Sequence, residues 1–222
     1  MKSAIVLLSG GLDSATVLYC AKSLGYKPHA LIFDYGQRHR KEIIQAKKIA
    51  RQAGCDYRVV KISLPWQGSS LLDKKMRLPQ NCRVIPKEIP STYVPARNII
   101  FLSFAASYAE AAGADAIFIG ANAIDYSGYP DCRPDFFKAF QKVIKQGMKA
   151  GVEGRTIRVM APLLHKTKAQ IIRLGLKLKV PYELTWSCYQ GGAKPCGKCD
   201  SCVLRDKGFL QVIKVTKTPG HQ

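Results

Sequence analysis

A glycine-rich turn between a short apolar run and a helical segment constrains this chain most. The apolar run Ala4–Leu8 leads directly into the turn SGGLDSA at residues 9–15. Two adjacent glycines let the backbone turn sharply and approach a ligand closely. The helix that follows presents unpaired N–H groups and the positive end of its dipole. A strand, a glycine turn and a helix in this order predict a phosphate-binding loop in an α/β fold.

The turn differs from two common nucleotide-binding loops. It lacks the Gly-Lys-Ser/Thr of a Walker A loop and the Gly-x-Gly-x-x-Gly of dinucleotide-binding proteins. It also contains a carboxylate, Asp13, which by itself repels phosphate. That carboxylate is accounted for if it orients the loop or holds Mg²⁺ against the phosphates. The alternative is an ordinary turn in which Asp13 caps the helix.

The rest of the chain alternates short apolar runs with helical patterns. Strands are predicted at Ala4–Leu8, Ala30–Phe33, Arg58–Ile62, Ala116–Ile119 and Arg158–Met160. Helical patterns lie between them, at residues 41–54, 98–113, 135–151 and 168–177. This alternation predicts a parallel sheet with helices on both faces. Ligands of such sheets bind at the carboxyl ends of the strands.

Several local signals refine this prediction. The helix at 98–113 is apolar on nearly all sides, which predicts a buried helix. Thr167 and Gln170 have the spacing of a capping box. The segment Ser63–Pro95 is rich in proline and lacks periodicity, which indicates a long loop, a lid or an interface arm. Glycines are expected to end four helices, at Gly25, Gly54, Gly113 and Gly175.

Four of the eight cysteines lie close together near the end of the sequence, at Cys188, Cys196, Cys199 and Cys202. Cys-x-x-Cys turns let backbone N–H groups stabilise thiolates, and four thiolates complete a tetrahedron around Zn²⁺. Because four sulfur ligands leave no open position, such a zinc is structural. Free thiols and an iron–sulfur cluster are the alternatives.

Composition gives expectations about location and partners. No apolar run reaches the roughly 18 residues of a membrane-spanning helix, and the N-terminus shows no signal-peptide cleavage site. We therefore expect a cytoplasmic protein with thiols rather than disulfides. The net charge is +20, from 35 basic and 15 acidic residues. This charge is compatible with a polyanionic partner such as nucleic acid or with a lysine-rich surface that has none.

The glycine turn and four further segments carry a family resemblance. Ser-Gly-Gly-x-Asp-Ser after the first strand resembles the PP-loop ATP pyrophosphatases, which bind the pyrophosphate part of ATP in this loop and transfer AMP to a substrate oxygen. Residues 33–42, 90–106 and 125–136 and the terminal cysteines narrow the resemblance to the 7-cyano-7-deazaguanine (preQ0) synthase family of queuosine and archaeosine biosynthesis. The resemblance runs from about Ser3 to Gly208.

The resemblance implies an architecture and two sets of binding residues. It implies an adenine nucleotide alpha-hydrolase-like, parallel-sheet α/β sandwich: a PP-loop ATP-binding domain in residues 1–180, with a zinc-binding segment in residues 181–222 packed on it. It places a structural Zn²⁺ on the four clustered cysteines and brings ATP with Mg²⁺ as co-substrate. The residues expected to contact ATP are Leu8, Ser9, Gly10, Gly11, Leu12, Asp13, Ser14, Ala15, Thr16, Val17 and Leu18.

Three residues are predicted to act in catalysis: Asp13, Arg97 and Lys168. Arg97 precedes the apolar helix and can reach phosphate or substrate, or merely cap that helix. Lys168 lies in the first turn of a helix, where a cation opposes the dipole, and a phosphate ligand explains that position. Lys166 is an alternative for this role, and ordinary solvation is the alternative for both lysines.

The segment SGYPDCRPDF is predicted to bind the substrate through Tyr129, Asp131 and Arg133. A planar, purine-like base favours aromatic stacking and a hydrogen-bonding carboxylate, and a substrate carboxylate favours an arginine. The alternative is a structural loop in which Asp131 and Arg133 pair with each other.

The family resemblance also implies the reaction. ATP, ammonia and 7-carboxy-7-deazaguanine give the nitrile through two adenylylated intermediates, and free ammonium is the expected nitrogen donor because no glutaminase is visible. We expect a homodimer that acts on small molecules and not on nucleic acid. A PP-loop enzyme that modifies tRNA directly is the main alternative, which the charge suits. A non-catalytic zinc-ribbon protein that binds nucleic acid is another, but it leaves the glycine turn unexplained.

Overall fold

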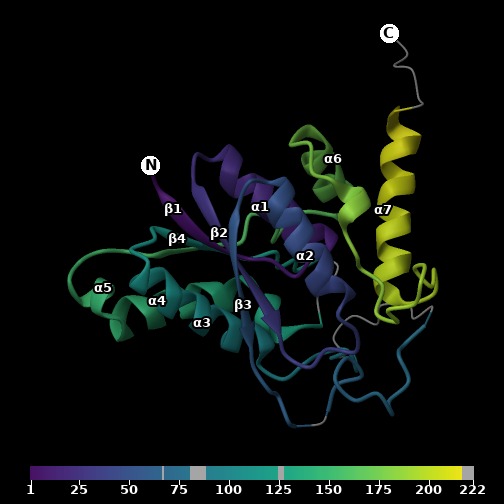
Figure 1. The fold of residues 1–222 in the computed structure, drawn as a ribbon, viewed down its shortest axis with the longest axis horizontal. Coiled ribbons are helices and arrows are strands. Elements are labelled where there is room, and N and C mark those ends of the chain that lie inside the picture. The colour runs from purple at the N-terminus through teal and green to yellow at the C-terminus, as the bar shows by residue number, and fades with distance from the viewer. Residues whose placement is uncertain (67, 81–88, 125–127, 217–222) are drawn as a thin grey trace.

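A computed structural model describes residues 1–66, 68–80, 89–124 and 128–216, and its centre is a parallel sheet (Figure 1). The five strands are ordered β3-β2-β1-β4-β5, and every neighbouring pair is parallel. Their bounds are β1 Ser3–Leu7, β2 Lys27–Asp34, β3 Asp56–Lys61, β4 Ala116–Phe118 and β5 Arg158–Met160. All five predicted strands are therefore confirmed, as is the α/β class.

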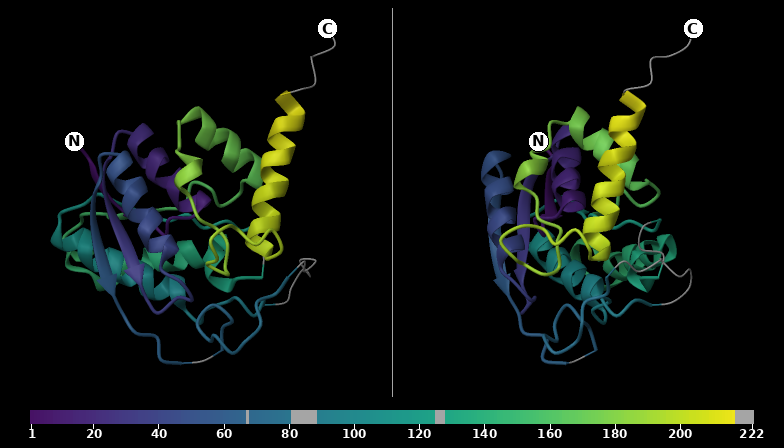
Figure 2. Two further views of the ribbon diagram at one scale, coloured as in Figure 1. Left: turned by 45° about the vertical axis from the view of Figure 1, so that its right-hand side comes forward. Right: turned by 90° about the vertical axis from the view of Figure 1, so that its right-hand side faces the viewer.

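Helices cover both faces of this sheet (Figures 1 and 2). They are α1 Leu12–Ser23, α2 Lys41–Gln52, α3 Arg97–Ala111, α4 Pro134–Gly147, α5 Lys149–Val152, α6 Lys168–Lys177 and α7 Asp200–Thr216. Two short 3-10 turns span Pro130–Cys132 and Tyr182–Leu184. None of the helices in the described residues is long and apolar enough to cross a membrane.

Alternating residues of the central strand build two separate cores. Ala4 and Val6 of β1 pack with α1, α2 and α6, whereas Ile5 and Leu7 pack with α3 and α4 on the opposite face. Successive side chains of a strand point to opposite faces, and a strand covered on both faces becomes a continuous apolar run. This explains why residues 4–8 contain no polar side chain.

Two details of the helices differ from the predictions. Helix α3 is not fully buried, because Ile99 is 44% and Phe104 is 42% exposed. Helix α6 does not end at Gly175 but continues to Lys177. A Cβ at Gly175 would lie 1.8 Å from the hydroxyl oxygen of Tyr182, so this glycine makes room for a ring and does not end the helix.

The C-terminal segment folds back over the rest of the chain. Helix α7 runs beside α6 (Figures 1 and 2). Gly208 of α7 lies so close to α6 that an added Cβ would be 2.6 Å from Cγ of Lys168. The backbone N–H of Trp186 donates to the carbonyl of Gly10, 2.9 Å away. The end of the chain therefore touches both the glycine turn and the helix that carries Lys168.

The loop that joins β3 to α3 contains no helix or strand in its described residues. Its backbone makes an isolated antiparallel bridge between Gln80 and Cys199. Ser69 and Ser70 are fully buried, and Leu71 lines the pocket described below. The predicted long loop is thus confirmed, and part of it packs against the site.

Candidate active site

The glycine turn lies at the carboxyl end of β1 and is closed by its own serines. The hydroxyl groups of Ser9 and Ser14 are 3.0 Å apart, the backbone N–H of Ser9 donates to Ser14 Oγ, and Ser14 Oγ–H donates to the carbonyl of Gly11. Gly11 is the N-cap of α1 and provides no side-chain cap. Residues of the first turn of α1 line a pocket, as an anion-binding helix terminus requires.

Gly10 adopts a conformation that other residues avoid. Its φ is +88°, and a Cβ there would lie 2.2 Å from the carbonyl oxygen of Glu42 and 2.8 Å from the backbone nitrogen of Ala46. The loop and the first turns of α2 are therefore in direct backbone contact. Gly120, after β4, similarly lies against the backbone of Ser14 on the other side.

Asp13 and Lys168 form an ion pair across the pocket. Lys168 Nζ donates to both carboxylate oxygens of Asp13, at 2.8 and 2.9 Å. The two side chains are only 18% and 10% exposed. The capping box predicted for Thr167 and Gln170 is present, and it fixes the start of α6 so that Lys168 faces the glycine turn. Lys166 is not among the residues that line the pocket.

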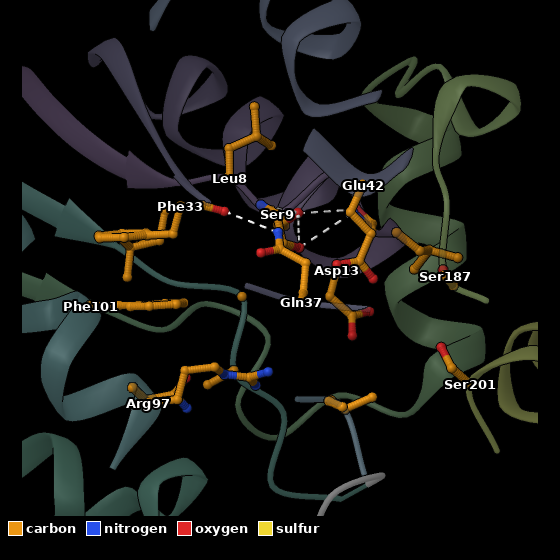
Figure 3. Close-up of a pocket in the computed structure, with 18 of the residues that line it drawn as sticks. Leu8, Ser9, Asp13, Phe33, Gln37, Glu42, Arg97, Phe101, Ser187 and Ser201 are labelled. Carbon is orange, nitrogen blue, oxygen red and sulfur yellow. Dashed lines mark hydrogen bonds between the residues drawn. The ribbon is translucent and has the colours of Figure 1, made fainter. Parts of the chain in front are cut away.

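The pocket combines polar and aromatic walls (Figure 3). Phe33 at the end of β2 and Phe101 of α3 stack with ring centroids 4.0 Å apart and nearly parallel planes. In the view of Figure 3 they lie on one side, and Asp13 and Glu42 lie on the other. A flat apolar wall opposite charged groups suits a ligand that joins a planar ring to an ionised group.

Arg97 brings a cation into the same pocket. It begins α3, and the residue before it, Ala96, has a φ of +55° at the N-cap position, a strained conformation for alanine. Burial away from water disfavours the charged form of its guanidinium and by itself lowers the pKa of Arg97. Tyr35, Tyr129 and Asp131 nevertheless raise the pKa of Arg97, so it remains a cation. No ion pair of Arg97 is present among the described residues.

The segment predicted to bind substrate contributes one residue to the pocket. Tyr129 lines it, and its hydroxyl group bonds to Thr92. Asp131 is buried and accepts a hydrogen bond from the backbone N–H of Asn98, so it caps α3 and does not face the pocket. Arg133 is exposed, does not line the pocket and makes no ion pair with Asp131. The aromatic residue just before this segment, Tyr126, lies outside the described residues.

Arg38 lines the pocket but is committed elsewhere. Its guanidinium donates to the carbonyls of Ser70 at 2.6 Å and Asp73 at 2.8 Å, and also to that of Met76. It therefore holds the β3–α3 loop against the site. The neighbouring His39 bonds through Nε2 to the carbonyl of Cys188 and so ties the end of β2 to the C-terminal segment.

Sequence reasoning missed several residues that line the pocket. The C-terminal segment contributes Trp186, Ser187, Tyr189, Ser201 and Arg205. No signal in the sequence placed them there, because their position depends on the fold of the segment around its cysteines. The bonds between Arg205, Thr185 and the carbonyl of Tyr182 hold the start of α7 over the pocket.

Glu42 was missed as well, although it lies in a segment that the family resemblance uses. It belongs to the first turn of α2, is partly buried and lines the pocket. Loss of hydration raises the pKa of this carboxyl group to about 7, although Arg97 acts in the opposite direction.

The four clustered cysteines could hold a metal ion. Their sulfur atoms all lie within 4.8 Å of one another, compared with a spacing of about 3.8 Å in an ideal tetrahedral zinc site. Backbone N–H groups of Gln190 and Cys196 donate to Cys188 Sγ, and those of Lys198 and Cys199 donate to Cys196 Sγ. Such donors stabilise thiolates, so the donor set fits a metal with closed sulfur coordination.

A comparison with known families assigns the chain. The sequence model of the family described as "Queuosine biosynthesis protein QueC" matches residues 3–213. The chain belongs to the QueC family. Curated relatives agree: a 7-cyano-7-deazaguanine synthase from Thermoplasma acidophilum is 56% identical over 211 residues, covering 95% of this chain and 88% of the relative. One from Trichodesmium erythraeum is 52% identical, covering 94% of this chain and 96% of that protein.

Solved structures support the fold of this QueC-family chain. A 4-thiouridine synthetase, solved as an RNA complex with bound ATP, aligns with a TM-score of 0.53 at 19% identity, covering 97% of this chain and 51% of that one. At this identity the likeness shows the fold alone. It confirms the predicted PP-loop, adenine nucleotide alpha-hydrolase-like architecture.

Proposed function

We propose that this chain converts 7-carboxy-7-deazaguanine, ammonia and ATP to 7-cyano-7-deazaguanine. The proposal is carried by one observation: the glycine turn of a QueC-family sequence forms one wall of a pocket that also contains Asp13, Lys168 and Arg97. In both the substrate carboxylate and the amide intermediate, the oxygen on the reacting carbon is a poor leaving group. Each must be activated before its oxygen can leave, and adenylylation does this with ATP in both cases.

The glycine turn is proposed to hold the pyrophosphate of ATP. Of the predicted contact residues 8–18, those that line the pocket lie between residues 8 and 14, and these would contact the nucleotide, with N–H groups of the first turn of α1 facing the phosphates. Residues 15–18 are fully buried in the core and do not line the pocket. Asp13 would hold Mg²⁺ against the phosphates, and Lys168 would then be released from Asp13 to neutralise phosphate charge. Phosphoryl and adenylyl transfer depend mainly on alignment and charge neutralisation, and this pair supplies a carboxylate and a cation within 2.9 Å.

Arg97 is proposed to bind the carboxylate of the substrate. It is a cation without an ion-pair partner among the described residues, and Phe33 and Phe101 lie in the same pocket. Tyr129 would contact the planar base, as the sequence predicted. Asp131 would act indirectly, because it caps α3 and thereby positions Arg97. Arg133 is not assigned a contact with substrate.

The metal of the four-cysteine cluster is proposed to be a structural Zn²⁺. Sulfur ligands from Cys188, Cys196, Cys199 and Cys202 leave no open position for substrate, so the ion would act by holding the C-terminal segment over the pocket. In this proposal residues 181–222 are a zinc-binding segment that completes the PP-loop domain of residues 1–180. Elemental analysis of the purified protein distinguishes zinc from iron.

Mass spectrometry of a defined reaction tests the proposal. Protein, ATP, Mg²⁺, ammonium and the 7-carboxy base should yield the nitrile together with AMP and pyrophosphate. ADP and phosphate as the only nucleotide products would refute the adenylyl route. A parallel reaction with tRNA in place of the base should give no modified nucleoside.

Three further expectations are part of the proposal: a cytoplasmic location, a homodimer and the absence of nucleic acid as a partner. Sedimentation measures the oligomeric state. Strong tRNA binding that weakens steeply with salt would contradict the last expectation.

A further inference from the structure

We propose that Glu42 is the proton acceptor for the reacting nitrogen, first for ammonium and then for the bound amide. This inference rests on the proposed function. It concerns a different part of the reaction from the glycine turn, which handles phosphate.

The chemistry requires such a group. Ammonium carries its full set of N–H bonds, and the nitrile nitrogen carries none. Every one of these protons must leave the nitrogen while it bonds to carbon. A positioned base accelerates proton transfer most when its pKa lies near the operating pH.

Glu42 lies beside the glycine turn and lines the same pocket. Its carbonyl oxygen would be 2.2 Å from a Cβ on Gly10, so its backbone touches the glycine turn. In the adenylylated intermediates the reacting carbon is joined through one oxygen to the α-phosphorus of ATP. A side chain that begins beside the phosphate loop and lines the same pocket can therefore reach the attacking nitrogen.

The other possible bases in the pocket are either engaged in contacts or buried. Among the described residues that line it, only Asp13 and Glu42 carry carboxyl groups. Both oxygens of Asp13 accept from Lys168. His39 Nε2 is held by the carbonyl of Cys188, and its Nδ1, although it has no hydrogen-bond partner in the described part of the chain, is buried and out of reach of a ligand. The side chain of Glu42 makes no hydrogen bond or ion pair within the described residues, so its carboxylate is available.

The charges around Glu42 suit this role. Arg97 of α3 and the phenol of Tyr35 after β2 act on it electrostatically. The other titratable residues that line the pocket are Asp13, Arg38, His39, Tyr129, Cys132, Lys168, Tyr189 and Arg205. Loss of hydration raises the pKa of Glu42 to about 7, with Arg97 opposing. A carboxyl group of this kind exchanges protons readily near neutral pH.

The proton transfers balance at each stage. Glu42 takes a proton from ammonium, and the lone pair of ammonia forms the C–N bond. AMP leaves with the electrons of the C–O bond, and a second proton passes from nitrogen through Glu42 to water. In the second half, the amide oxygen displaces pyrophosphate from another ATP. Loss of the remaining N–H protons then lets the nitrogen lone pairs complete the triple bond as AMP leaves.

Glu42→Gln separates this role from phosphate chemistry. Exchange of labelled pyrophosphate into ATP, measured with the 7-carboxy base and without ammonium, involves no N–H bond. We expect this exchange to stay within about threefold of the unmodified enzyme. Nitrile formation should fall by about 10²-fold or more, the usual contribution of a general base. Glu42→Asp, which keeps a carboxylate, should recover part of the rate.

Two controls make the result specific. Glu153→Gln removes an exposed carboxyl group just after α5, outside the pocket, and should leave both reactions unchanged. Hydroxylamine is largely unprotonated at neutral pH, so with the 7-carboxy base it should form a hydroxamate in Glu42→Gln at a rate closer to that of the unmodified enzyme.

The outcomes separate this inference from the proposed function. If the unmodified enzyme makes no nitrile, the proposed function fails. If it does, and Glu42→Gln makes nitrile at the same rate, Glu42 is not the proton acceptor. Equal loss of exchange and nitrile formation would also overturn the inference, because Glu42 would then serve the phosphoryl step, for example as a ligand of Mg²⁺.

Discussion

Replacement of Gly10 by alanine tests how the glycine turn is built. The added Cβ would lie 2.2 Å from the carbonyl oxygen of Glu42, about 1.2 Å short of an ordinary contact of 3.4 Å. The Cβ would also lie 2.8 Å from the backbone nitrogen of Ala46. Because both contacted atoms belong to the backbone, neither can move away by a side-chain rotation. The φ of +88° adds a second cost, because alanine avoids this region.

The magnitude follows from these two terms. A left-handed conformation costs a residue with a Cβ about 1–2 kcal/mol, and overpacking in a closed structure costs about 1–3 kcal/mol. Gly10→Ala should therefore lower the free energy of unfolding by about 2–5 kcal/mol. At roughly 2–4 °C per kcal/mol for a chain of this size, the melting temperature should fall by roughly 4–20 °C.

The neighbouring glycine provides a matched control. Gly11 has a φ of −80°, and a Cβ there would meet Ser9 Oγ at 3.5 Å and the carbonyl oxygen of Trp186 at 3.7 Å, which are ordinary contacts. Gly11→Ala should cost about 1 kcal/mol or less. Urea unfolding monitored by circular dichroism measures both variants. Equal stabilities would refute the argument, because they would show that the loop and α2 are not in backbone contact at Gly10.

Three further predictions concern charge, metal and pH. Asp13→Asn should keep the fold but lower turnover by at least about 10²-fold, because Lys168 loses its partner and the phosphates lose a carboxylate for Mg²⁺; kinetics beside a circular dichroism spectrum measure this. Cys199→Ser should lower both the metal content and the melting temperature, whereas Cys55→Ser, at a buried cysteine outside the cluster, should leave the metal content unchanged. Folding raises the pKa of Glu42 from 4.5 to about 7. Between these two pH values the folded protein holds a proton on Glu42 that the unfolded chain has lost, so the free energy of unfolding falls as the pH rises from 4.5 to about 7. Urea unfolding at pH 5 and pH 8 should show a smaller loss of stability for Glu42→Gln than for the unmodified protein. The same loss of stability in both proteins would contradict this prediction.

The fold was predictable because its signals are local. The apolar run Ala4–Leu8 is the pattern of a strand buried on both faces, and Gly25, Gly54 and Gly113 follow their helices with positive φ as expected. Gly175 shows the limit of this reasoning. Its role depends on the ring of Tyr182, whose hydroxyl donates to the carbonyl of Ile171, and a window of neighbouring residues contains no trace of such a contact.

The site was less predictable because residue type does not reveal which polar groups are already engaged. Arg38 has the chemistry of a phosphate ligand, yet its guanidinium is occupied by loop carbonyls. Asp131 has the chemistry of a base-binding carboxylate, yet it caps α3. Glu42 looked like an ordinary acidic residue in the first turn of a helix, and only the fold places it beside the glycine turn.

The proposed reaction does not use the four clustered cysteines in its chemistry. Their position in the C-terminal segment gives them a structural role instead. The backbone of Trp186 bonds to Gly10, Gly208 allows α7 to lie against Lys168, and Arg205 lines the pocket. These contacts bring the segment to the glycine turn, to Lys168 and to the pocket. The small core around the cysteines consists of Trp186 and three buried cysteines with partly buried neighbours. A metal ion bound by all four thiolates would therefore hold this part of the segment rigidly over the pocket.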